Sequence, residues 1–76
     1  MNQKDELWKN ISIGVNATIK TIQQRDGALS PQAKKDIETR LRPQLLDGFA
    51  LMFQEVGITR DEAIKGITDL VAKALA

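Results

Sequence analysis

The sequence contains no cysteine and no histidine, and these two absences remove several kinds of site at once. Zinc sites built from Cys and His, and catalytic pairs that join a nucleophile to an imidazole base, need one or both residues. The only large aromatic side chains are one Trp and two Phe, so little is available to enclose a buried pocket. There is also no glycine-rich phosphate-binding loop. We therefore expect a protein that is not an enzyme and that binds no metal and no cofactor.

Long hydrophobic runs and export signals are missing as well. No stretch of about twenty apolar residues occurs, so we expect no membrane-spanning segment. The chain opens MNQKDELW, which lacks the apolar core of a signal peptide. Together with the lack of cysteine, this favours a cytoplasmic location, where the Asn-x-Ser/Thr triplets at Asn10 and Asn16 would not be glycosylated.

The chain is short but has the composition of a globular protein. It has 76 residues, of which 42% are hydrophobic and 28% are charged, so we expect one small domain. A domain of this size buries only about 60–65% of the surface that its unfolded chain exposes. Because neither disulfides nor zinc can stabilise it, we expect association, most simply as a homodimer.

The net charge of +1 is unevenly distributed. Residues 1–45 carry eight Lys/Arg against five Asp/Glu, a net +3, and residues 46–76 carry three against five, a net −2. The basic residues concentrate at Lys34, Lys35, Arg40 and Arg42. This group is either a solvated helix face or a modest phosphate-facing patch.

Residues 4–25 carry two overlapping patterns. Every second residue of ISIGVNATI is apolar, as on a half-buried strand, but a second set recurs every three or four positions, as on a helix. The helical set is Leu7, Trp8, Ile11, Val15, Thr18, Ile19 and Ile22. We expect a helix, because a strand here would have hardly any other segment to pair with. Ile13 and Ala17 fall outside the helical stripe, and we expect Ile13 and Trp8 to contact a partner.

Turn and cap residues divide the rest of the chain. Gly27 suits the left-handed position that ends a helix, and Ser30-Pro31 combines an N-cap with a proline at the first helical position. Pro43 would cost about 3 kcal/mol inside a continuous helix. We therefore expect a boundary or a sharp kink near Arg42, with a new helix starting at Pro43.

The C-terminal half predicts a helix–Gly–helix hairpin, with helices at about 43–56 and 60–75. Gly57 followed by Ile58 is a helix stop, and Thr59 opens a capping box for the second helix. The first helix is apolar over a wide arc, which indicates either self-association or a central place in a monomeric bundle. We expect self-association through Leu46, Phe49, Ala50, Leu51, Met52 and Phe53.

A family resemblance covers residues 36–75. Ile37, Thr39 and Leu41 alternate, Pro43 opens a helix, and Gly57-Ile58-Thr59-Arg60 forms the turn between two helices. In this order IETRLRPQLLDGFALMFQEVGITRDEAIKGITDLV resembles the ribbon-helix-helix family of small dimeric DNA-binding proteins. The resemblance implies that residues 36–41 pair as a strand with a second copy and enter the major groove. It also implies DNA contacts from Glu38, Arg40, Arg42, Thr59 and Arg60.

We therefore expect a mainly α fold, in which residues 36–41 are either a dimer-pairing strand or a helix. The alternative is an all-α bundle of three or four helices. Within the single domain, residues 1–29 would be a helical extension and residues 36–76 the core. We predict a small dimeric regulator that binds duplex DNA, of repressor, antitoxin or mobile-element type. The alternative is an all-helical protein–protein interaction module without DNA binding, such as a small inhibitor or adaptor from a phage or plasmid.

Overall fold

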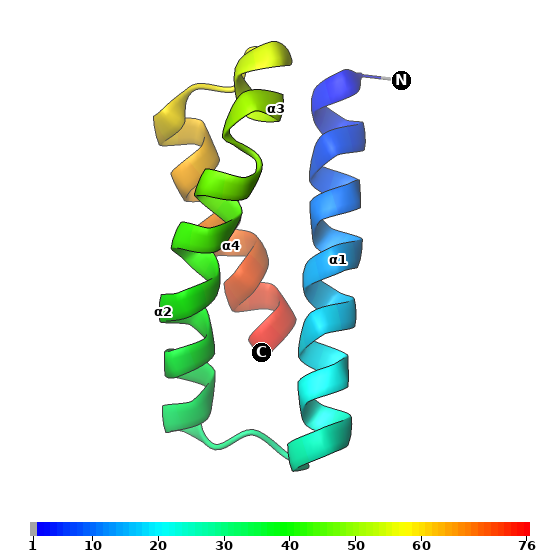
Figure 1. Cartoon of the computed structure of the whole chain (residues 1–76), viewed down its shortest axis with the longest axis vertical. Coiled ribbons are helices and arrows are strands. Elements are labelled where there is room, and N and C mark those ends of the chain that lie inside the picture. Colours follow the sequence, from blue (N-terminus) through cyan, green and yellow to red (C-terminus); the bar gives the residue numbers. More distant parts are fainter. Residues whose placement is uncertain (1) are drawn as a thin grey trace.

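A computed structural model describes residues 2–76 (Figure 1). These residues form four helices and no strand: α1 (Gln3–Asp26), α2 (Pro31–Gly48), α3 (Ala50–Glu55) and α4 (Arg60–Leu75). In Figure 1, α1 descends on the right, α2 and α3 return upward on the left, and α4 lies behind them. The mainly α fold and its all-α alternative are confirmed. None of these helices is both long and apolar enough to cross a membrane.

The N-terminal segment is a helix, as the three-to-four spacing predicts. Asn2 caps it, because its side-chain oxygen accepts a hydrogen bond from the Lys4 amide at 2.8 Å. Gly27 ends it at φ 80° and ψ −159°, a conformation that is open almost only to glycine. The buried residues of α1 are Leu7, Ile11, Val15 and Ile19, which all belong to the expected stripe.

Residues 36–41 lie inside α2, so the strand alternative for this segment is wrong and the helix alternative is confirmed. Ser30 caps α2 as expected, because its hydroxyl oxygen accepts a hydrogen bond from the Ala33 amide at 3.1 Å. Pro31 occupies the first turn, where its missing N–H is not needed.

The predicted boundary near Arg42 is also wrong, because α2 continues through Pro43 and ends at Gly48. Pro43 is exposed, so its ring points to solvent. Apolar residues on both sides of the proline pack on the core, and their burial offsets the lost helical hydrogen bond. These residues are Ile37, Leu41, Leu45, Leu46 and Phe49. The interruption comes instead at Phe49, with φ −107° and ψ 10°, between α2 and α3.

The turn before α4 follows the sequence prediction. Gly57 has φ 78°, and the Ile58 amide donates to the Phe53 carbonyl at 2.8 Å, which is the hydrogen bond of a Schellman stop. Ile58 is buried, and Thr59 caps α4 by accepting a hydrogen bond from the Glu62 amide at 3.2 Å. The helix–Gly–helix hairpin is thus confirmed, with its first arm divided between α2 and α3.

The core lies where α1, α3 and α4 meet, and α2 contributes no fully buried side chain. Beyond the four residues of α1, its members are Phe53, Ile58, Ala63, Ile67, Val71 and Leu75. The bundle is elongated, with extents of 37 × 22 × 18 Å and a radius of gyration of 12.8 Å. A typical domain of this length has a radius of about 11.4 Å. The helices therefore leave more of their surface uncovered than a compact domain does.

Candidate functional site

The residues that the family resemblance assigns to DNA do not share one surface. Glu38 and Arg42 approach each other to 4.0 Å along α2. Arg40 is two positions from each and points to nearly the opposite side of the helix, where it lines a groove against α1. Thr59 is occupied as the cap of α4, and Arg60 lies beside it at the start of that helix. The structure therefore brings together only the acid–base pair, and no phosphate-facing cluster forms from these five residues.

The residues predicted to self-associate divide into two groups. Phe53 is buried in the chain's own core, and Trp8, Leu46 and Phe49 pack against it. The others face outward, and the exposed fractions of the three large ones are 58% for Ile13, 74% for Leu51 and 49% for Met52. Ala50 is exposed as well. Half of these residues thus contribute to the chain's own core, although Trp8 is only half-buried and leaves part of its side chain uncovered.

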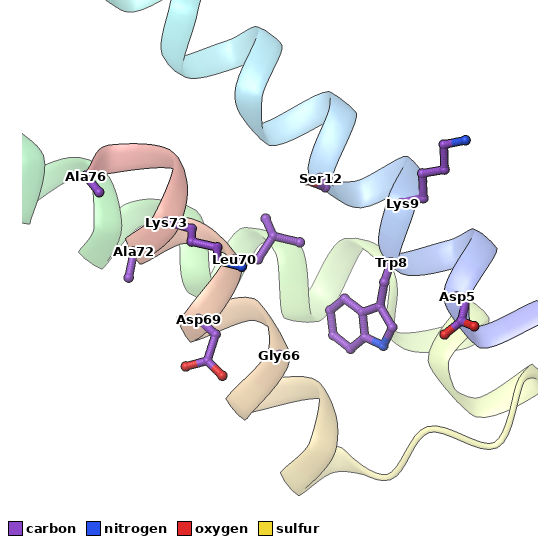
Figure 2. A pocket seen from close by; sticks show the side chains of 10 residues that line it. All are labelled: Asp5, Trp8, Lys9, Ser12, Gly66, Asp69, Leu70, Ala72, Lys73 and Ala76. Atoms are coloured by element: carbon purple, nitrogen blue, oxygen red, sulfur yellow. The ribbon is translucent and has the colours of Figure 1, made fainter.

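A shallow groove of about 980 Å³ lies between α1 and α4 (Figure 2). Trp8 projects from α1 toward Gly66, and the side chain of Leu70 lies farther along α4. The remaining lining is small or charged, and comprises Asp5, Lys9, Ser12, Asp69, Ala72, Lys73 and Ala76. The groove therefore combines two large apolar side chains with a charged rim on each of its two helices.

Trp8 holds α1 against both α3 and α4. Its ring centroid lies 5.3 Å from that of Phe53, with a tilt of 38° between the planes. A Cβ added to Gly66 would lie only 2.6 Å from Trp8 Cζ2, so a side chain at position 66 would force the outer edge of the indole away from α4. Sequence reasoning missed Gly66. The signal that could have identified it is its position in the interior of a predicted helix, where glycine lowers helix stability by about 1 kcal/mol relative to alanine.

The four charged side chains on the rim alternate in sign. Asp5 and Lys9 are four residues apart on α1, and Asp69 and Lys73 repeat this order on α4. Within residues 2–76, none of the four takes part in an ion pair. They are therefore available to a second molecule.

A second groove separates α1 from α2 near the loop that joins them. Half-buried apolar residues, among them Ile22, Leu29 and Ile37, line it. Arg25 lies on its edge and bonds Asp26 at 3.2 Å, and this contact raises the pKa of the Arg25 guanidinium. This groove has no aromatic side chain. In residues 2–76, no group of three or more acidic side chains is placed to hold a metal ion.

Comparisons with protein-family models, curated proteins and solved structures gave no match to this chain. The ribbon-helix-helix resemblance therefore stays a prediction from sequence, and the helical conformation of residues 36–41 removes the strand on which its DNA contacts depend. The function has to be argued from the surfaces of the chain itself.

Proposed function

We propose that this protein is an all-helical protein–protein interaction module, and that its α1–α4 groove receives one helix of another polypeptide. The observation that carries this proposal is the placement of Trp8 and Leu70 in an open groove between two helices. Partly uncovered aromatic and aliphatic side chains, surrounded by polar residues, are typical of protein-binding sites.

The shape of the groove favours a helix as its ligand. Two helices form its walls, and an amphipathic helix laid between them would complete a bundle. Its apolar side would contact Trp8 and Leu70, while its polar flanks would meet Asp5 and Lys9 on one wall and Asp69 on the other. A small flat ligand would leave most of the charged rim unused.

The exposed area of the chain supports the same conclusion. The accessible surface is 5489 Å². A folded monomer of 8.4 kDa is expected to expose about 4,600 Å², so the excess is roughly 900 Å². Each partner in a standard protein–protein interface buries about 800 Å². The uncovered surface is therefore large enough for one specific interface.

The same surface supports DNA binding less well. A phosphate-binding face needs several cations together, whereas Arg40 lies in the groove between α1 and α2, and Arg42, on the opposite side of α2, lies 4.0 Å from the Glu38 carboxylate. We expect no retention of duplex DNA by the purified protein even at low salt, measured by fluorescence anisotropy. Retention that falls steeply with salt and with Arg40→Ala would support the DNA-binding alternative instead. A cytoplasmic location remains part of our proposal.

Site-specific photo-crosslinking in the cells that encode the protein tests the interaction. A photoreactive residue at Ser12, which lines the groove, should give a discrete adduct with a protein chain. The same residue at Thr21, exposed farther along α1 and outside the groove, is the control position. Ala72→Arg should fill the groove and remove the Ser12 adduct, whereas Ala17→Arg should leave it unchanged. Equal adducts from Ser12 and Thr21, or a Ser12 adduct that persists in Ala72→Arg, would contradict the proposal.

A further inference from the structure

We infer that the groove is occupied by α4 of a second copy of this chain, in a two-fold symmetric dimer whose α4 helices run antiparallel past each other near position 71. This inference rests on the proposed function and names the partner. It places the dimer contact on α4, and so differs from the expectation that residues 46–53 self-associate.

The first argument is the match between α4 and its own reverse. In an antiparallel pair related by a two-fold axis, residues equally distant from the axis lie at the same level. The groove-lining residues of α4 are Gly66, Asp69, Leu70, Ala72, Lys73 and Ala76. Positions 66 and 76, 69 and 73, and 70 and 72 are each equally distant from position 71. The spacing alone follows from the helical repeat, so the residue types carry the information.

Those residue types are complementary at the two levels whose residues share one face of α4. Asp69 meets Lys73 of the second copy, and by symmetry Lys73 meets its Asp69, so each dimer has two opposite-charge contacts. Leu70 and Ala72, two positions apart, point to nearly opposite sides of α4 and so flank this contact, with Leu70 on the side of α1 (Figure 2). Gly66 meets Ala76 of the second copy, and two small residues allow the helix backbones to approach closely.

The second argument is the charge of the rim as a whole. Its two acidic and two basic side chains sum to zero, and none is paired within residues 2–76. A strongly acidic or strongly basic partner helix would place like charges against two of the four. A second copy supplies equal numbers of both signs, and on α4 both rim charges, Asp69 and Lys73, meet their opposites.

The third argument is area. Close packing of α4 on its copy would also cover the exposed edge of Trp8, because Trp8 lies on Gly66 at one end of the proposed contact. The excess surface of roughly 900 Å² is summed over the whole chain, and it is large enough to include the roughly 800 Å² that each partner of a standard dimer buries. Leu51 and Met52 lie on α3, outside the groove lining, and would remain exposed.

Analytical ultracentrifugation of charge-reversal variants tests the inference. We expect the wild-type chain to sediment as a dimer at micromolar concentration. Asp69→Lys and Lys73→Asp should each raise the dimer dissociation constant by about tenfold, because symmetry doubles the effect of each reversal. The double variant D69K/K73D should return to within about threefold of wild type, since both contacts are restored with exchanged signs.

Two variants on α2 provide matched controls. Asp47→Lys and Lys35→Asp make the same charge changes at exposed positions outside the groove, and should leave the dissociation constant unchanged. Far-UV circular dichroism of all variants should show wild-type helix content, because residues 69 and 73 are exposed.

The outcomes separate this inference from the proposed function. A wild-type monomer at about 100 μM, or a double variant no better than its parents, overturns the α4 pairing. If the chain is monomeric but Ser12 still gives an adduct with a different protein that Ala72→Arg removes, only the inference fails. If the chain is monomeric and Ser12 gives no such adduct, the inference and the proposed function both fail.

Discussion

Replacing Gly66 with alanine should destabilise the fold, although alanine is the better helix former. The substitution gains about 1 kcal/mol of helix propensity. Against this, its Cβ would lie 2.6 Å from Trp8 Cζ2 and 3.0 Å from Cζ3, so the indole must move. Moving it weakens the contact with Phe53, where the ring centroids are 5.3 Å apart.

The magnitude follows from these opposing effects. An aromatic pair contributes about 0.5–1.5 kcal/mol, and overpacking costs about 1–3 kcal/mol in total. After the gain in propensity, we expect Gly66→Ala to lower the free energy of unfolding by about 1 kcal/mol. For a domain of this size, that corresponds to a fall in Tm of about 4–8 °C.

Gly14 provides a matched control for this change. It lies in the interior of α1, and a Cβ added there would meet nothing within 4 Å. Gly14→Ala should therefore raise stability by about 0.5–1 kcal/mol. The two identical substitutions are expected to shift Tm in opposite directions, which thermal unfolding followed by far-UV circular dichroism would measure. Trp8 is the only tryptophan, so its emission should shift to the red in Gly66→Ala alone.

The decisive result is the sign of the Gly66→Ala effect. A rise in Tm equal to that of Gly14→Ala would mean that Trp8 does not lie on α4. A double-mutant cycle adds a second check, because Gly66→Ala should become stabilising by about 1 kcal/mol once Trp8 is replaced with alanine.

Substitutions at three further positions test the helix boundaries by urea denaturation. Pro43→Ala should raise the free energy of unfolding by about 2 kcal/mol, because it restores a hydrogen bond inside α2; a loss of stability would argue that the helix breaks there. Gly57→Ala should cost about 1 kcal/mol, because residue 57 has φ 78°, and a neutral effect would contradict the Schellman stop. Thr59→Ala should cost about 1 kcal/mol through loss of the cap on Glu62, whereas Thr59→Ser should keep most of it.

The parts of the fold that could be predicted from sequence depend on contacts within one turn of helix. The Ser30 hydroxyl bonds an amide three residues away, and so does the Thr59 hydroxyl. Gly27 and Gly57 have positive φ, as their places after a helical pattern predict. Since each of these interactions involves neighbouring residues, the identity of the residue and its position suffice to predict it.

The sequence carries conflicting signals for residues 36–41, because Ser30-Pro31 predicts a helix that enters this segment while the alternation of Ile37, Thr39 and Leu41 fits a strand. Ile37 and Leu41 are four positions apart, a separation that fits both the period of a strand and that of a helix. In the structure the Thr39 hydroxyl donates to the Lys35 carbonyl four residues back, as in a helix. The helix continues past Pro43 because the core lies against both halves of α2, and that arrangement is tertiary.

The candidate site was predictable only in part, for the same reason. The stripe on α1 includes Trp8, but the periodicity of one helix does not say which residue of another helix it will meet. The groove forms where Trp8 of α1 contacts α4 at Gly66. Because Gly66 has no side chain, its role is apparent only in the folded structure, where Trp8 lies against it. In the sequence alone, Asp69 and Lys73 have the pattern of ordinary solvated residues on a helix. Only the structure shows that they line the groove.

Gly66 also connects the stability of the chain to its proposed interface, and single substitutions can separate the two. Gly66 packs under Trp8 and lines the groove, so Gly66→Ala should weaken both folding and dimer formation. Ala72 lines the groove but is exposed, so Ala72→Arg should abolish the dimer while leaving the free energy of unfolding of the monomer within about 0.5 kcal/mol of wild type. Gly14→Ala should raise the free energy of unfolding and leave dimer formation unchanged, because it strengthens α1 away from the groove. If Ala72→Arg lowered monomer stability as much as Gly66→Ala does, position 72 would have to be part of the core, and the α4 face would not be free for a second copy.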